Sequence, residues 1–417
     1  MNRQLIIQMW NERRQNIALW LELFLVSIVL WFVVDFLYVR LTVYYEPLGY
    51  DISHTYRLSI VPVPQDSPDY HDCVETYREA KHRFLTQLEK RSDIEAIGFA
   101  EQGIHYSGSR WSIPSVQCDS LKSDWAWGYT VSPGYLKVFR IGGARGESPE
   151  EMAVLLNEEG FLAGENLFDR VLKTDLHNMV NHFFVLNEYQ PEWQKPPMRL
   201  LGVMNTIRRD EFTSAYDSRS VLYTHKQRDW EDHRVVYIRV KAKDDHDFIP
   251  RITREMEQNW SGQNLMFSDV IAVSDLRYND LRDVENDLRN HVCIMAFLLL
   301  NVFLGLLGTF WYRTQRRRSE IALHIAMGSN RKQVLVRLLS EGLILLVAAT
   351  LVALPVDYLI ARYGFTEWMD GATFAPLRLG ITVGIAFLWI GLMLMCGILF
   401  PAYKMMQIRP AEALHEE

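Results

Sequence analysis

The sequence predicts a helical membrane protein with four transmembrane helices and a large external α+β domain of two lobes. Two observations support this fold class. Apolar runs long enough to span a bilayer lie near both ends of the chain, and the polar middle alternates strand and helix patterns. The mean hydropathy of -0.08 hides this division, because the polar middle dilutes the apolar ends.

Four apolar segments each have the roughly 20 residues that a helix needs to cross a hydrocarbon core. We place them at residues 17–42, 291–312, 334–363 and 378–402. The first is too long for a cleaved signal peptide and no A-x-A site follows it, so we interpret it as an uncleaved anchor. Ahead of it, residues 1–16 favour a cytoplasmic amphipathic helix, with a frayed N-terminus as the alternative.

The positions of Lys and Arg predict how these segments are oriented, because short cytoplasmic loops are enriched in both. Basic residues gather before the first segment, between the second and third, and after the fourth. The loop of residues 364–377 instead contains Glu367 and Asp370. We therefore expect both termini, the loop of residues 313–333 and the tail of residues 403–417 in the cytoplasm. Residues 43–290 would then lie outside the inner membrane.

The external segment contains a strand, helix and strand pattern twice. The first set covers residues 58–63, 73–88 and 94–100, and the second covers residues 235–240, 248–260 and 265–273. Two such sets predict a split β-α-β, ferredoxin-like lobe built from residues of about 50–120 and 233–275.

Residues of about 125–230 would form an inserted α/β lobe. Strands are expected in it at residues 152–156, 182–186, 199–203 and 220–223. After the second set, a charged helical pattern at residues 275–290 runs directly into the second apolar segment. This continuity would either couple motions outside and inside the membrane or serve only as packing support.

The polar residues outside the apolar segments do not predict catalysis. The net charge of -7 argues against a nucleic-acid partner. Asp244-Asp245-His246-Asp247 resembles a metal cluster, but it precedes a predicted helix and is better explained as a capping and dipole-pairing run. We expect no catalytic residue and no bound metal. Cys73 and Cys118 lie in the external segment, where they form a disulfide or remain two free thiols.

Four acidic residues lie within or beside the apolar segments, where a charge is costly and often functional. They are Glu22, Asp35, Glu341 and Asp357. All four are near predicted membrane surfaces, so helix pairing or an interfacial position is favoured over a proton relay.

The loop between the second and third segments has more order than the orientation rule requires. Residues 320–327 predict a short amphipathic helix, and Gly328 supplies the positive φ that ends such a helix. Asn330 then caps the helix that becomes the third apolar segment. An ordinary basic loop is the alternative.

This loop resembles a known family. Residues 320–329, E-I-A-L-H-I-A-M-G-S, are similar to the E-I-x-x-x-x-A-L/M-G-A/S signature of the FtsX-like permease domain of MacB-type (type VII) ABC transporters. Pro401-Ala402 and the I-R-P-A-E-A-L stretch at residues 408–414 are similar to the family's C-terminal ending. Residues 131–139 and 154–158 resemble, less sharply, the core of the MacB-type periplasmic domain.

The resemblance implies a non-catalytic permease subunit that works in export or efflux by mechanotransmission. In this reading a separate ATPase hydrolyses ATP, and the permease converts its closure into shape changes outside the membrane. The implied ATPase-coupling residues are Glu320, Ile321, His324, Ala326, Met327, Gly328, Ser329 and Arg331. The implied C-terminal motif comprises Pro401, Pro410, Glu412, Ala413 and Leu414. His324 and Ile325 stand where many relatives have basic residues, which affects the charge pairing with the ATPase.

The expected cofactors and partners follow from the same resemblance. The sequence has no G-x-x-x-x-G-K-[ST] loop, so we expect no ATP hydrolysis and no cofactor on this chain, with ATP and Mg²⁺ bound by the partner ATPase. Other expected partners are a second permease copy or a paralogue in a dimer, membrane lipid, and a periplasmic adaptor with an outer-membrane protein.

Two other functions remain open from the sequence, and a third is disfavoured. One is lipoprotein extraction, as in the LolC/LolE relatives, and another is activation of an external hydrolase, as FtsX does. A membrane-anchored sensor would need a cytoplasmic signalling domain, for which the short predicted loops leave no room.

Overall fold

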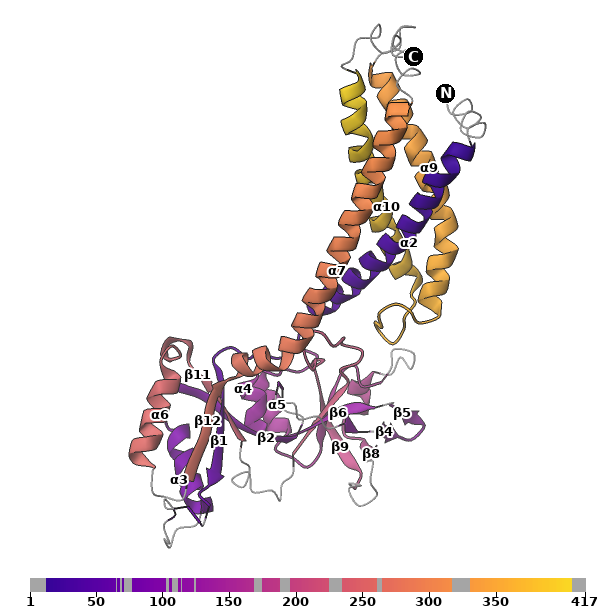
Figure 1. Cartoon of the computed structure of the whole chain (residues 1–417). Helices are drawn as coiled ribbons and strands as arrows, with labels where there is room; N and C mark the ends of the chain where they lie inside the picture. Colours follow the sequence, from indigo (N-terminus) through magenta and orange to yellow (C-terminus); the bar gives the residue numbers. More distant parts are fainter. Residues whose placement is uncertain are drawn as a thin grey trace. The chain divides into compact units, whose positions relative to one another are not determined.

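The computed structural model describes most of the chain. The described residues are 13–64, 66–67, 70, 77–102, 105–106, 112–113, 115–123, 125–168, 175–187, 196–224, 235–260, 265–316 and 331–406. The chain divides into two compact units (Figure 1). We call Met1–Thr42 with Asn286–Glu417 the helical unit, and Val43–Glu285 the sheet unit.

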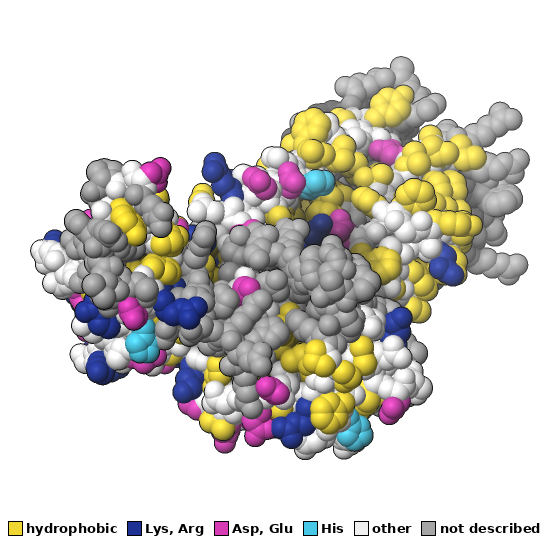
Figure 2. Space-filling model, turned by 90° about the horizontal axis from the view of Figure 1, so that it is seen from below, with side chains coloured by type: hydrophobic (Ala, Val, Ile, Leu, Met, Phe, Trp, Pro, Cys, Tyr) yellow, Lys and Arg dark blue, Asp and Glu magenta, His cyan; other side chains and the backbone are white. Residues whose placement is uncertain are grey.

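Four helices in the described residues are long and apolar enough to cross a membrane, which confirms this part of the predicted fold. They are α2 (Arg13–Tyr44), α7 (Val273–Arg316), α9 (Arg331–Arg362) and α10 (Pro376–Met406). Figure 2 shows hydrophobic side chains gathered on the helical unit, whereas charged side chains are interspersed among them on the sheet unit. An apolar surface of this kind suits a hydrocarbon solvent.

Helices α2, α9 and α10 share one core. Leu23 of α2, Leu346 of α9 and Ile390 of α10 are fully buried in it. Helix α7 adds only partly buried Leu299 and Val302 from its described residues. Many of its other apolar side chains are exposed, namely Val292, Ile294, Phe297, Leu298, Leu300 and Leu304. Helix α7 is therefore the least covered of the four.

The sheet unit is a mixed α/β structure, as predicted. Its twelve described strands follow the order β12-β1-β11-β2-β6-β10-β7-β9-β8-β4-β5, with β3 paired to β6. The strands are β1 (Thr55–Pro62), β2 (Ile94–Gln102), β3 (Ser112–Ile113), β4 (Ser115–Cys118), β5 (Leu121–Lys122), β6 (Ala126–Val131), β7 (Phe161–Gly164), β8 (Phe183–Asn187), β9 (Met198–Met204), β10 (Ser220–Tyr223), β11 (Val235–Val240) and β12 (Leu265–Ala272). The helices of this unit are α3 (Tyr77–Glu89), α4 (Pro133–Val138), α5 (Pro149–Leu155) and α6 (Phe248–Asn259).

Strands β12, β1, β11 and β2 are antiparallel neighbours with different helices on their two faces (Figure 1). Successive side chains of a strand point to opposite faces. On β11, Val236 and Ile238 accordingly pack with α3 and α6, whereas Tyr237 packs with α4. Arg239, two residues after Tyr237, shares the α4 face.

The predicted strand at residues 152–156 is wrong, because these residues belong to the end of helix α5 and the turn after it. The side chain of Ser148 accepts a hydrogen bond from the Glu151 backbone (3.2 Å), and the Glu151 carboxylate accepts one from the Ser148 backbone (2.7 Å). Pro149 occupies the start of the helix. This capping box and N-terminal proline outweigh the strand-like apolar run that follows them.

The division into lobes also differs from the predicted one. Strands β3 and β4 lie in residues assigned to the first lobe, yet β3 pairs with β6, and β4 pairs with β8. Pairing between distant strands depends on which partner completes a buried face, and periodicity along the chain does not report it.

Helix α4 lies unusually close to strand β2. The Ser132 backbone donates to the Phe99 carbonyl (2.9 Å), and the Ser132 hydroxyl accepts from the Phe99 N–H (2.8 Å). A Cβ added at Gly134 would lie 2.0 Å from the Ile97 carbonyl oxygen. In the S-P-G sequence at residues 132–134, only glycine at the last position therefore allows α4 to approach β2 this closely.

We expect Gly134→Ala to destabilise the protein by about 1–3 kcal/mol, because the added methyl group must displace backbone. The measurement is thermal unfolding of the full chain in detergent. Gly384→Ala is the matched control, since a Cβ at Gly384 meets nothing within 4 Å. Equal melting temperatures for the two variants would contradict the proposed close approach.

Candidate functional site

Most residues of the predicted coupling site lie outside the described residues. These are Glu320, Ile321, His324, Ala326, Met327, Gly328 and Ser329, and the same holds for Pro410, Glu412, Ala413 and Leu414. Arg331 is the first residue of α9, and Pro401 lies in α10. The roles of all these residues stay predictions.

Cys118 is buried and has no disulfide to a described residue, and Cys73 lies outside the described residues. Burial and the neighbouring Asp119 raise the pKa of the Cys118 thiol. The pairing of Cys118 with Cys73 stays untested.

The acidic run at residues 244–247 takes part in separate polar pairs. Asp245 accepts a hydrogen bond from the Tyr56 hydroxyl (2.6 Å) and contacts Nδ1 of His54 (2.8 Å). Asp247 stands at the N-cap of α6 without a side-chain capping bond and pairs with Arg251 (3.0 Å). Among the described residues no group of three or more His, Cys, Asp or Glu is placed to hold a metal ion.

The candidate site lies on the loop between β9 and β10, residues 205–219, which we call the junction loop. It binds the two segments through which the sheet unit continues into the apolar helices. One segment is residues 43–51, at and after the end of α2, and the other is the first turns of α7.

Arg208 joins the junction loop to the segment after α2. Its guanidinium is fully buried and donates to the backbone carbonyls of Glu46 (2.6 Å), Thr213 (2.9 Å) and Glu211 (2.8 Å). The Arg208 backbone also donates to the Leu48 carbonyl (2.8 Å). Burial lowers the pKa of Arg208, and the nearby Glu46 carboxylate opposes this shift.

Two further contacts tie down the same segment. Gly49 has a φ of +81°, and a Cβ there would lie 2.1 Å from the Thr206 carbonyl oxygen. Arg239 of β11, also fully buried, donates to the Asp51 carbonyl (2.6 Å) and carboxylate (3.2 Å). The chain after α2 is therefore held both by charged hydrogen bonds and by close backbone contact.

Glu211 joins the junction loop to α7. One carboxylate oxygen accepts a hydrogen bond from Arg277 in the first turns of α7, and the other accepts from the Tyr106 hydroxyl (3.2 Å). Glu211 is only 7% exposed. Burial opposes the charge of Arg277, but the hydrogen bond and charge of Glu211 outweigh it and raise the pKa of Arg277.

The junction loop is internally ordered. The Asp210 carboxylate accepts from the Phe212 backbone and the Thr213 hydroxyl (both 2.9 Å), and the Ser218 hydroxyl donates to the Ser214 carbonyl (2.8 Å). Such local side-chain bonds stiffen a turn.

An aromatic cluster around His105 packs beside the loop. The ring of His105 stacks on Tyr50 with 4.1 Å between centroids, and the Tyr50 hydroxyl donates to Tyr106 (2.8 Å). Burial lowers the pKa of His105 to about 3. The imidazole is therefore neutral at physiological pH and acts as part of the apolar core.

Two of the four acidic residues in the apolar helices link one helix to another. Asp35 of α2 is buried against Arg378 of α10, with 2.8 Å between Arg378 Nε and Asp35 Oδ1 and a second bond from Nη2. Glu22 of α2 accepts from the Thr309 hydroxyl of α7 (3.0 Å). These contacts support the predicted helix-pairing role.

The other two acidic residues, Glu341 and Asp357, are buried in α9. One oxygen of Asp357 has no hydrogen-bond partner among the described residues.

Sequence reasoning identified Asp35 but not its partner, and it missed the junction loop entirely. The only local signal for the loop is the density of Asp, Ser and Thr at residues 210–218, which indicates tight turns. The sequence does not indicate that Arg208 is buried, because arginine is usually exposed.

The four apolar helices and the α/β unit define a membrane protein with one large domain between its first and second spans. Comparison with known families makes this more specific. Residues 292–410 match the family model described as FtsX-like permease C-terminal, so this part of the chain is an FtsX-like permease domain. The match covers α9 and α10 entirely and more than half of α7, and it confirms the resemblance drawn from residues 320–329 and from the start of the 408–414 stretch.

Solved structures provide a second comparison. The chain is similar to the periplasmic region of MacB from Actinobacillus actinomycetemcomitans (12% identity, 58% of this chain, 98% of that one, TM-score 0.32). It is also similar to the extracellular domain of the noncanonic ABC-type transporter YknZ from Gram-positive bacteria (10% identity, 51% and 100% coverage, TM-score 0.30). A comparison with curated proteins found no match.

We expect Arg277→Gln to lower the free energy of unfolding by about 2 kcal/mol, because it leaves the buried Glu211 carboxylate without its charged partner. Chemical unfolding of the full chain measures this loss. Arg282→Gln, on an exposed side chain of the same helix, is the control and should have little effect. In the Arg277→Gln, Glu211→Gln double variant the losses should not add. Additive losses would disprove the pairing.

The second prediction from this site concerns pH. Because the pKa of His105 is lower in the folded than in the unfolded chain, where it is about 6.5, the unfolded state binds the proton first on acidification. This residue's contribution to stability is therefore full above about pH 6.5 and falls by up to roughly 1.4 kcal/mol per pH unit below that value.

Denaturant midpoints measured between pH 7.5 and 5 test this contribution. The His105→Phe variant should lose less stability than the parent protein over this range. His246→Phe is the control, because the His246 side chain is 87% exposed. A His105→Phe protein with the parent's pH dependence would show that His105 is not the titrating group.

Proposed function

We propose that the chain is the permease subunit of a MacB-type ABC transporter. It would be a non-catalytic subunit that couples ATP hydrolysis by a separate ATPase to a change of shape outside the membrane. The observation that supports this best is the FtsX-like permease match over residues 292–410. Export or efflux, with a periplasmic adaptor and an outer-membrane protein as partners, is the transport reaction we favour.

On the cytoplasmic side, the coupling element at residues 320–329 docks into the ATPase, which holds ATP and Mg²⁺. Helix α7 ends at Arg316 and helix α9 begins at Arg331, so this element connects the two helices directly. A push from the ATPase would therefore act on both. The termini lie on the same side of the inner membrane in this proposal, as the basic residues indicate.

Helix α7 carries the motion outward. It is one helix of 44 residues from Val273 to Arg316. Val273, Leu276 and Leu281 near its start belong to the core of the sheet unit, and Arg277 binds Glu211 of the junction loop. A continuous helix anchored in this way is suited to transmit an axial or tilting displacement. The ferredoxin-like lobe, β12-β1-β11-β2 with α3 and α6, and the inserted lobe would change shape in response.

The working unit is a dimer with a second copy or a paralogue. The exposed apolar side chains of α7, among them Ile294, Phe297 and Leu300, support this proposal. Helices in a bilayer associate through close packing, and α7 packs least against its own chain.

Co-purification with an ATPase tests the proposal. The protein is purified in mild detergent together with its neighbouring gene products, and the ATPase of the ABC type is quantified. We expect a stoichiometric ATPase from the parent protein and at least a tenfold loss from a Glu320→Ala, Met327→Ala variant. Gly328→Pro should abolish ATPase-coupled activity, because proline cannot adopt the positive φ predicted there. Asp370→Asn, in the opposite loop, is the control.

The ATPase result also separates this proposal from its alternatives. Full coupling in the Gly328→Pro protein would contradict the role of the coupling element. If no ATPase is recovered at any salt concentration, transport coupling is wrong, and an external protein partner becomes the next target.

A further inference from the structure

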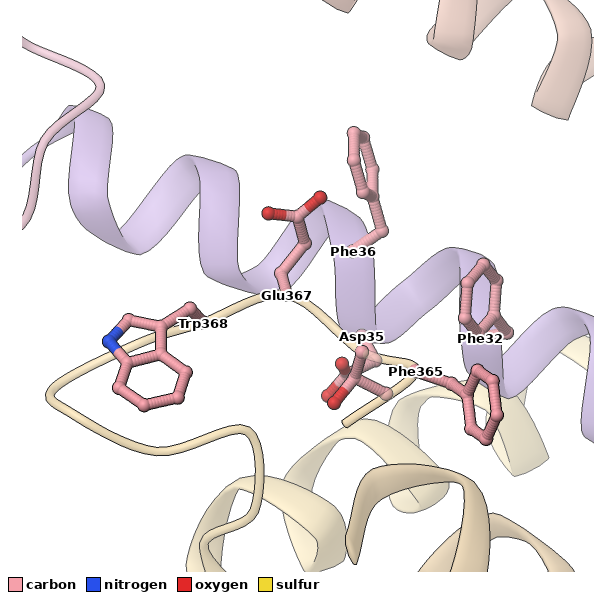
Figure 3. Close-up of a pocket in the computed structure, with 7 residues that line it drawn as sticks. Phe32, Asp35, Phe36, Phe365, Glu367 and Trp368 are labelled. Atoms are coloured by element: carbon pink, nitrogen blue, oxygen red, sulfur yellow. The ribbon is translucent and has the colours of Figure 1, made fainter. Parts of the chain in front are cut away.

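A pocket of about 190 Å³ opens in the helical unit between α2 and the loop that connects α9 to α10. Four aromatic rings and two carboxylates line it, from Phe32, Phe36, Phe365, Trp368, Asp35 and Glu367. Figure 3 shows the two carboxylates between Trp368 on one side and Phe32 with Phe365 on the other. Aromatic faces and carboxylates together favour a cationic group.

The two carboxylates are held in place by arginines that do not line the pocket. Arg378 binds both oxygens of Asp35 and donates to the Glu367 backbone carbonyl (2.9 Å). Arg40 binds the Glu367 carboxylate (3.0 Å). Asp35 is almost fully buried, and about a third of the Glu367 side chain is exposed. The pocket therefore presents carboxylates in fixed positions, and each is balanced by an arginine, as suits a ligand that itself has both charges.

Arg40 adds a binding group for an anion beside the pocket. Its guanidinium lies over the Phe36 ring, 5.5 Å from the centroid, and donates to Glu367 through Nη2 alone among the described residues. The Arg40 Nε is buried, and the Nη N–H groups that do not bind Glu367 remain for a second partner such as a phosphate. A group that binds cations and a group that binds anions are therefore in direct contact at Glu367 and Arg40.

The position of the pocket relative to the apolar run of α2 indicates which kind of ligand it meets. Asp35 directly follows the apolar run of α2, and Arg40 lies further along the same helix. Phe365 is 71% and Trp368 57% exposed. Exposed aromatic rings beside paired charges at the end of a span are typical of the level of lipid headgroups.

We propose that this pocket binds the headgroup of a zwitterionic aminophospholipid, with the ammonium group between the aromatic rings and Glu367 and the phosphate on Arg40. The two charges of such a headgroup are a few bonds apart, which matches a carboxylate and a guanidinium that touch each other. A lipid bound there would join α2 to the α9–α10 loop. This inference does not depend on the proposed transport function.

Native mass spectrometry of the delipidated full chain tests the proposal. The probes are phosphatidylethanolamine and phosphatidylglycerol with the same acyl chains, which share the phosphate but differ in the ammonium group. We expect at least about fivefold greater retention of phosphatidylethanolamine, a preference that corresponds to about 1 kcal/mol. Equal retention of the two lipids would overturn the proposal.

Matched variants test whether the preference for phosphatidylethanolamine arises at this pocket. Glu367→Gln and Trp368→Ala should each reduce it at least about threefold, while Arg40→Gln should weaken binding of both lipids by way of the phosphate. The controls are Asp370→Asn in the same loop and Trp389→Ala, an exposed tryptophan on α10 outside the pocket. Glu367→Gln preserves the size of the side chain, so its result stands even if Trp368→Ala does not fold. A preference that survives Glu367→Gln, or that the controls lose equally, would show that lipids bind elsewhere.

Discussion

The buried guanidinium of Arg208 is the interaction on which the arrangement around the junction loop depends. It donates hydrogen bonds to three backbone carbonyls that lie outside the strands of the sheet. These are the carbonyls of Glu46, Glu211 and Thr213. Buried carbonyls without partners are costly, and a rigid planar guanidinium can serve several at once. Once Arg208 fixes the backbone at Glu211, the carboxylate of that residue faces Arg277. The chain segments that enter and leave the sheet unit are thereby bound to one loop.

In the apolar helices, too, buried polar groups are held by partners, but fewer polar groups are involved. A charge in a hydrocarbon environment is tolerated only when it is paired, and Asp35 with Arg378 meets this condition across α2 and α10. Helix α9 completes the same core. Among the described residues, helix α7 contacts that core only at its margin, and a hydrogen bond from Thr309 to Glu22 links it to α2. This division supports the proposal that α7 is the helix through which motion passes.

The elements that the sequence predicted well are those defined by local patterns. The apolar helices follow from length and composition, and the structure places β1, β2, β11, β12 and α6 close to their expected ranges. Helix α5 was missed because its start signal, Ser148 to Glu151, precedes an apolar run that also suits a strand. The short strands β6 and β7 were not anticipated. They are only six and four residues long and contain glycine, which weakens a strand pattern.

The sequence by itself determined the four apolar helices, the FtsX-like character of residues 292–410 and the motif expected to meet an ATPase, because each depends on residues close together in the chain. Only the tertiary structure decided the junction loop and the aromatic pocket. Arg208 and Glu46 are 162 residues apart, and Asp35 and Arg378 are 343 apart. Such pairs form because folding buries both partners together, and no periodicity along the sequence records which buried charge will meet which partner.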